Sequence, residues 1–109
     1  MRRAILFEEP TVDYLAVHQH VKHVVFLFSD TQARPSILDN SIVPAITDAL
    51  ERINFDPKSD YLVVTGELLP VVLMIGAASY KHNFINLLVF SVPDRNYLPM
   101  RLELDEAVG

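Results

Sequence analysis

The chain has 109 residues, half of them hydrophobic, and its 14 acidic and 9 basic residues give a formal net charge of −5. This length suits one domain with a single core, and the apolar content excludes intrinsic disorder. Apart from Arg2-Arg3 no basic cluster occurs along the chain, so binding to a DNA or RNA backbone is disfavoured unless distant residues assemble a basic patch in space. Because so much of a small chain is apolar, we expect a homodimer that buries part of its surface.

Cysteine is absent, which excludes disulfides, thiolate metal sites and cysteine nucleophiles. The apolar stretch near the N-terminus is too short for a signal peptide. The longest apolar run, residues 68–78, contains Pro70 and is shorter than the roughly 20 residues that a membrane span needs. We therefore expect a soluble cytoplasmic protein without membrane association.

The first half of the chain predicts two strands and a helix. Residues 3–7 form a short apolar strand, and residues 11–22 fit a short helix or an irregular turn equally well. The apolar run at 23–28 predicts a strand covered on both faces, and a loop follows. A helix is expected over 42–53, with one apolar face made by Ile42, Ile46, Ala49, Leu50 and Ile53.

The second half predicts a strand at 61–65, a tight turn, a helix at 70–80 and a hairpin of strands 84–92 and 97–104, with the tail 105–109 frayed. The helix has no polar residue before Ser79, so we expect it to be buried on more than one side. Gly76 costs on the order of 1 kcal/mol of helix propensity, which close packing on the sheet or on a partner helix would offset. Pro99 marks an edge strand, and Tyr14, Tyr80 and Tyr97 are expected to be exposed.

This order of elements predicts an α/β fold: a small Rossmann-like open sheet, mostly parallel, with a C-terminal antiparallel hairpin as its edge strand. If residues 11–22 cross over the sheet, the strand order is 2-1-3-4-5 and the topological switch falls between the first and third strands. Ligands bind at such points, outside the carboxyl ends of the strands. The candidate ligand-binding residues there are Thr65, Gly66, Glu67, Ser29 and Asp30.

The Thr65-Gly66-Glu67 turn precedes a helix, and amides at a helix N-terminus attract phosphate. Against this, no glycine-rich phosphate motif is present, and the carboxylates of Glu8, Glu9 and Glu67 repel an anion. The simplest role of Gly66 is to make the turn between strand and helix.

Three histidines, His18, His20 and His23, would form part of a metal site only if a third and fourth ligand joined them. No such ligand set is marked, so solvent-facing histidines are expected and neither a metal nor a cofactor is predicted. No serine has a nucleophile-elbow context, and Asp30, Asp60 and Asp94 occur where turns and caps favour aspartate, so no catalytic residue is predicted.

The segments 60–66 and 86–90, the Asp94-Arg95 turn and Tyr97-Leu-Pro99 resemble small phage-encoded proteins over the C-terminal half of the chain. The strand-Thr-Gly-helix unit is also remotely similar to CRISPR-associated Rossmann-fold (CARF) domains, which bind or cleave cyclic oligonucleotides as dimers. That similarity implies that Thr65 and Gly66 face the ligand.

Two hypotheses of function follow. The first is a protein with no evident catalytic site that acts by binding, as a homodimer or with a host or viral protein partner, in the host cytoplasm if it is viral. Its expected interface residues are Val71, Met74, Ile75 and Tyr80. The alternative is binding, sequestration or cleavage of a nucleotide-like ligand at the carboxyl ends of the strands.

Overall fold

The computed structural model describes residues 2–10, 13–29 and 34–104. Its elements, in chain order, are β1 (Arg3–Glu8), the 3-10 helix η1 (Leu15–Gln19), β2 (His23–Phe28), α1 (Ile42–Arg52), β3 (Asp60–Val64), α2 (Leu68–Ser79), β4 (Phe84–Ser91) and β5 (Asn96–Glu103). The described part of the 11–22 segment therefore contains a short 3-10 helix, while the expected frayed tail at 105–109 lies outside the described residues. No helix in the described ranges is long and apolar enough to cross a membrane.

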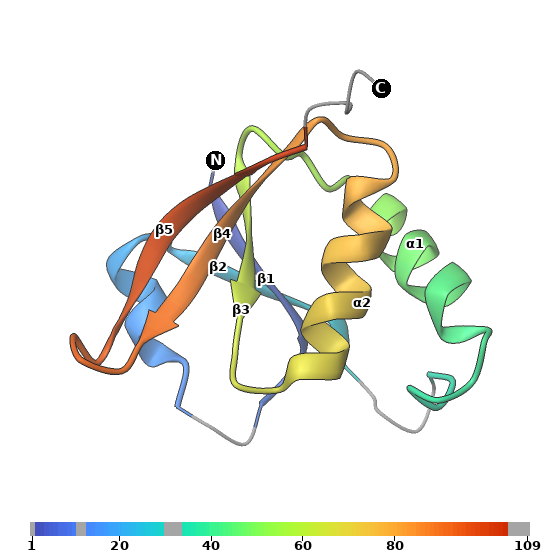
Figure 1. The fold of residues 1–109 in the computed structure, drawn as a ribbon, viewed down its shortest axis with the longest axis horizontal. Helices are drawn as coiled ribbons and strands as arrows, with labels where there is room; N and C mark the ends of the chain where they lie inside the picture. Colours follow the sequence, from blue (N-terminus) through green and yellow to red (C-terminus); the bar gives the residue numbers. More distant parts are fainter. Residues whose placement is uncertain (1, 11–12, 30–33, 105–109) are drawn as a thin grey trace.

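The five strands form one sheet in the order β2-β1-β3-β4-β5. β1 pairs in parallel with β2 and β3, β3 pairs in parallel with β4, and β5 is antiparallel to β4. The predicted α/β class, the strand order and the antiparallel edge strand are confirmed. In Figure 1, α1 and α2 lie together beside β3 and β4, whereas η1 lies behind β4 and β5 on the opposite face of the sheet.

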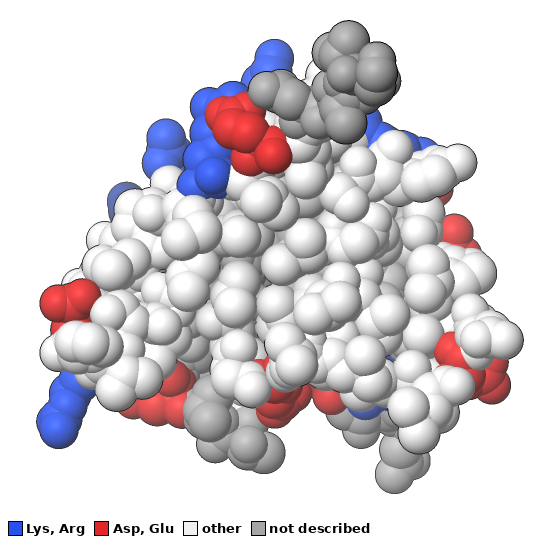
Figure 2. Space-filling view, in the orientation of Figure 1, with Lys and Arg blue, Asp and Glu red and all other residues white. Residues whose placement is uncertain are grey.

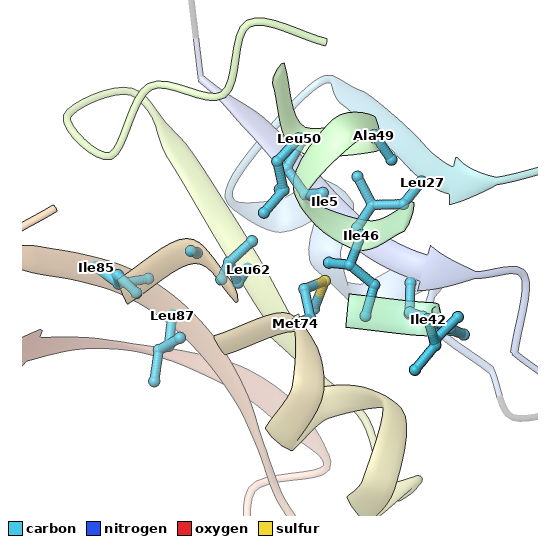
Figure 3. Packing of buried hydrophobic residues seen from close by; sticks show 12 residues of the cluster. Ile5, Leu27, Ile42, Ile46, Ala49, Leu50, Leu62, Met74, Ile85 and Leu87 are labelled. Carbon is cyan, nitrogen blue, oxygen red and sulfur yellow. The ribbon is translucent and has the colours of Figure 1, made fainter. Parts of the chain in front are cut away.

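The helical face of the sheet holds the larger core. Ile46 of α1 and Met74 of α2, both fully buried, point toward Ile5 and Leu62 of the central strands (Figure 3). The apolar face predicted for α1 is confirmed, because Ile42, Ile46, Ala49 and Leu50 are all buried and Ile53 packs against them.

The opposite face of the sheet holds a second core beneath η1. Val17 and Val21 pack there against alternate residues of the strands, and Leu88 and Tyr97 close this core from the hairpin. β1 contributes to both cores, which is why four consecutive residues, 4–7, are buried.

The prediction that Tyr97 is exposed is wrong: the residue is 1% exposed. Tyr97 pairs with Phe90, on the face that η1 covers, and the Nε2 of His20 lies 2.7 Å from the Tyr97 carbonyl oxygen. Leu98 and Met100 point to the helical face instead, beyond the strands on which α2 packs, and are 44% and 55% exposed. Leu102, on the same side of β5 as Leu98 and Met100, is partly buried against the larger core, so the exposure of this side is confined to the middle of the strand.

β2 was expected to be covered on both faces, yet only Leu27 of its six residues is buried. The strand lies at the edge of the sheet and pairs with β1 alone, so its other edge has no neighbouring strand. Its apolar run reflects partial rather than complete burial.

α2 begins at Leu68, two residues before the predicted start, because Pro70 is tolerated in a first turn whose amides lack acceptors within the helix. The expectation that Gly76 packs closely on the sheet is wrong. Gly76 is exposed, and a Cβ atom added there would meet nothing within 4 Å. The structure thus leaves Gly76 without close packing inside the described part of the chain.

Candidate functional site

At the carboxyl end of β3, Thr65, Gly66 and Glu67 form the turn into α2, as the sequence indicates. The Thr65 hydroxyl accepts a hydrogen bond from the Glu67 amide at 3.3 Å, and Glu67 is the N-cap residue of α2 without a side-chain capping bond. Gly66 has no positive φ, and a Cβ there would meet nothing within 4 Å. The turn therefore does not require the conformational freedom of glycine.

The neighbouring carboxylate of Glu8 is neutralised by a residue that sequence reasoning missed. Arg34 donates two hydrogen bonds to it, Nε to Oε2 at 2.8 Å and Nη2 to Oε1 at 3.0 Å, and its guanidinium lies 5.1 Å from the centre of the Phe7 ring. The hydrogen bond to Glu8 raises the pKa of Arg34. Arg34 is the one basic residue of the segment 29–40, which is the only sequence signal for this pair.

The five candidate ligand-binding residues do not meet in one hollow. Ser29 lines a hollow of about 280 Å³ with Arg34 and Arg52, whereas Thr65, Gly66 and Glu67 line none of the hollows described for this surface. Asp30 lies outside the described residues. A nucleotide-like ligand at the carboxyl ends of the strands thus stays a prediction.

The three histidines have separate environments. His18 and His23 are exposed, and His20 contacts the Tyr97 carbonyl through Nε2. Among the described residues there is no group of three or more side chains placed to hold a metal ion.

The residues expected at an interface divide into two groups. Val71 and Met74 are 5% and 0% exposed on the buried side of the helix, and Met74 belongs to the core between α2 and the sheet. Ile75 is partly buried, and Tyr80, just after the helix, is 86% exposed. Val71 and Met74 are therefore not accessible to a partner, whereas an interface that includes Ile75 and Tyr80 stays a prediction.

A further exposed surface, the apolar face, combines the outer side of α2 with the helical side of β5. Its members are 44–76% exposed and are Leu68, Leu69, Val72, Leu98 and Met100. The two elements are neighbours through β4, on which α2 packs and with which β5 pairs. Figure 2 shows this front surface without charge across its centre, with basic side chains at the upper left and acidic ones mainly along the lower edge and the right.

A protein-family model described as "Phage Pam3 gp32-like protein" matches residues 2–104. No curated protein and no solved structure matches the chain. The resemblance to small phage-encoded proteins is thereby confirmed, and the similarity to CARF domains receives no support.

Proposed function

The chain belongs to the family of phage Pam3 gp32-like proteins, and we propose that it acts by binding, as a homodimer assembled through the apolar face. The observation that carries this proposal is the outer side of α2. Leu68 and Val72 are 76% and 53% exposed there, where a surface helix of a monomeric protein normally carries polar residues. Exposed apolar side chains gathered on one surface are typical of an interaction site.

A second copy of the chain is a partner that the charge distribution allows at the apolar face. With a net charge of −5, two copies repel one another at long range, so they associate best where charge is absent. The centre of the apolar face meets that condition (Figure 2). Two-fold symmetry then needs only that this face is complementary to itself.

The face, rather than the edge, of β5 is the proposed contact. Pro99 lacks an amide hydrogen, and Arg101 and Glu103 carry charges along the same strand. Proline and charge at an edge strand act against pairing with a strand of another molecule. Leu98 and Met100 are instead available on the side of the sheet shared with α2.

The test is the mass of the protein in solution. By light scattering after size exclusion at high micromolar concentration, the wild-type protein is expected to have the mass of a dimer. Val72→Glu, which places two facing charges at the centre of a two-fold contact, is expected to give a folded monomer. Leu15→Glu is the matched control, because Leu15 is 65% exposed on η1, across the sheet from the apolar face, and it should leave the dimer intact.

A wild-type protein that stays monomeric at the highest concentration tested would contradict the proposal. So would a dimer that Val72→Glu leaves unchanged while circular dichroism shows both proteins folded. A protein partner from host or phage, and action in the host cytoplasm, stay predictions.

A further inference from the structure

A second hollow lies on the other face of the sheet, at the amino ends of β1 and β3, and it is basic. It has a volume of about 430 Å³, and its lining consists of Arg2, Lys58, Tyr61, Phe84, Asn86, Pro99, Met100 and Arg101. Three of these eight residues are cations and none is a carboxylate. Residues from distant parts of the chain thus assemble the basic patch that the linear sequence lacks.

The strand register explains why these residues meet. Tyr61 pairs with Asn86, and Asn86 pairs with Arg101, so the three lie side by side across β3, β4 and β5. η1 covers the other end of this face, where it packs on Leu88 and Tyr97. The amino end of the face is left open to a ligand.

Aromatic rings hold two of the three cations in place. The Arg2 guanidinium carbon lies 5.5 Å from the centre of the Tyr61 ring and Arg2 donates to the Tyr61 hydroxyl; the Arg101 carbon lies 3.9 Å from the centre of the Phe84 ring. A guanidinium stacked on a ring is oriented before a ligand arrives, with further N–H groups still able to donate. Asn86 donates to the Pro57 carbonyl at 3.0 Å and so fixes the loop that carries Lys58.

Three carboxylates lie near the hollow without lining it. Asp60 is paired with Arg3, and Asp56 accepts hydrogen bonds from the Lys58 amide and the Ser59 hydroxyl. Glu103 pairs with Arg101 at 2.8 Å, but both side chains are more than half exposed, and such a surface pair opens easily. Within the described residues, Arg2 and Lys58 form no ion pair.

We propose that this hollow binds a small compound that carries two or more phosphoryl groups, such as a nucleoside diphosphate or triphosphate. Arginine binds phosphate oxygens in a bidentate manner and lysine adds a compact charge, so three cations suit more than one phosphoryl group. The volume is in the range of small-molecule sites. The remaining acidic surface repels a long nucleic acid, which favours a free compound over a polynucleotide.

Calorimetric titration with pyrophosphate, with ATP and with a short single-stranded DNA that ends in a 5′-hydroxyl tests the proposal. Binding of pyrophosphate and ATP is expected, with weakening at high salt, and binding of the oligonucleotide is not. Lys58→Gln and Arg101→Gln should each weaken binding about tenfold or more, since a hydrogen bond to a charged group contributes roughly 1.5–3 kcal/mol. Arg95→Gln removes the same charge at the exposed tip of the same hairpin and should leave affinity unchanged.

Amide chemical shifts locate the site independently of the variants. Added pyrophosphate should move the amide signals of Tyr61, Asn86 and Arg101. Failure of both phosphate compounds to bind, binding of the oligonucleotide alone, or shifts confined to Ser29, Thr65 and Gly66 would each overturn the proposal. Equal losses of affinity in Arg95→Gln and Arg101→Gln would also overturn the proposal, because they would show that binding depends only on the net charge of the protein.

Discussion

Asp60 is the one buried charged residue in the described part of the chain, and its contacts explain how β1 and β3 start in register. Arg3 donates to both of its oxygens, from Nε at 2.9 Å and Nη2 at 2.8 Å, and the Asp56 amide donates to Oδ2 at 2.8 Å. Arg3 also donates to the Ile53 carbonyl at 3.0 Å, at the end of α1. One ion pair therefore ties the two central strands to the helix between β2 and β3.

Asp60→Ala is expected to lower the free energy of unfolding by about 3–5 kcal/mol, because it leaves Arg3 and the Asp56 amide without their acceptor in a largely buried place. Urea unfolding measures this loss. Glu51→Gln serves as the comparison, because Glu51 pairs with Lys81 at 2.5 Å with both side chains more than half exposed, and a surface pair stabilises little. Similar losses in the two variants would contradict a structural role specific to Asp60.

Tyr97 gives the molecule a defined response to alkaline pH. Burial raises the pKa of its phenol above the ordinary 10.0, and the negative charge of Asp13 acts in the same direction. Above about pH 10 the unfolded chain has lost this proton while the folded protein still holds it, so stability falls as pH rises. Between about pH 8 and about pH 11, the urea concentration at the midpoint of unfolding should therefore decrease less in Tyr97→Phe than in the wild type. If the midpoint decreased equally in both proteins, this contribution of Tyr97 to stability would be excluded.

The contacts of these residues show which properties of a single residue cannot be predicted from the sequence. The sequence around Asp60 favours a turn or a cap. It contains no feature that predicts Arg3 as the partner of Asp60 in an ion pair. The Glu8–Arg34 pair is similar, because it forms only when the loop after β2 returns to the end of β1. Ion pairs between residues 26 or 57 positions apart depend on the topology, which local patterns do not contain.

At the scale of elements, Gly76 lowers the helix propensity of α2, and a substitution there can raise it. This glycine is exposed, has no positive φ, and leaves open space where a Cβ would lie. Gly76→Ala should therefore raise the free energy of unfolding by about 1 kcal/mol through helix propensity. The measurement is best made in the Val72→Glu background, where dimer formation does not contribute. A loss of stability there would mean that the α2 backbone at Gly76 is tightly packed in the monomer.

The existence, type and order of the main elements follow from hydrophobic periodicity, and the strand order from the right-handed connections. Which side of each element is buried does not follow as directly. In β5 the alternation separates Tyr97 from Leu98 correctly, but η1 covers the side with Tyr97, while on the other side Leu98 and Met100 stay exposed. In α2 no residue before Ser79 is polar, so the pattern could not distinguish Met74 in the core from Val72 on the surface.

At the scale of the whole molecule, the two faces of the sheet offer different chemistry. The helical face carries the apolar side chains of α2 and β5, and the opposite face carries the basic hollow around Tyr61 and Asn86. The sequence indicated an apolar excess that a partner could cover, but it could not reveal a basic site built from residues 2, 58 and 101. Charges that are scattered along a chain of net charge −5 become a patch only after folding.

Because the sheet separates these two surfaces everywhere except at Met100, which belongs to both, dimerisation and phosphate binding are expected to be independent. The Val72→Glu monomer should bind pyrophosphate with the wild-type dissociation constant, and one pyrophosphate should bind per chain in both proteins. Conversely, Arg101→Gln should keep the mass of the wild-type protein. Independent sites have a coupling free energy near zero, so loss of the dimer leaves pyrophosphate binding unchanged, and loss of pyrophosphate binding leaves dimerisation unchanged. A dissociation constant that changes several-fold on loss of the dimer would mean that the partner copy reaches the basic hollow, around Met100 at its rim.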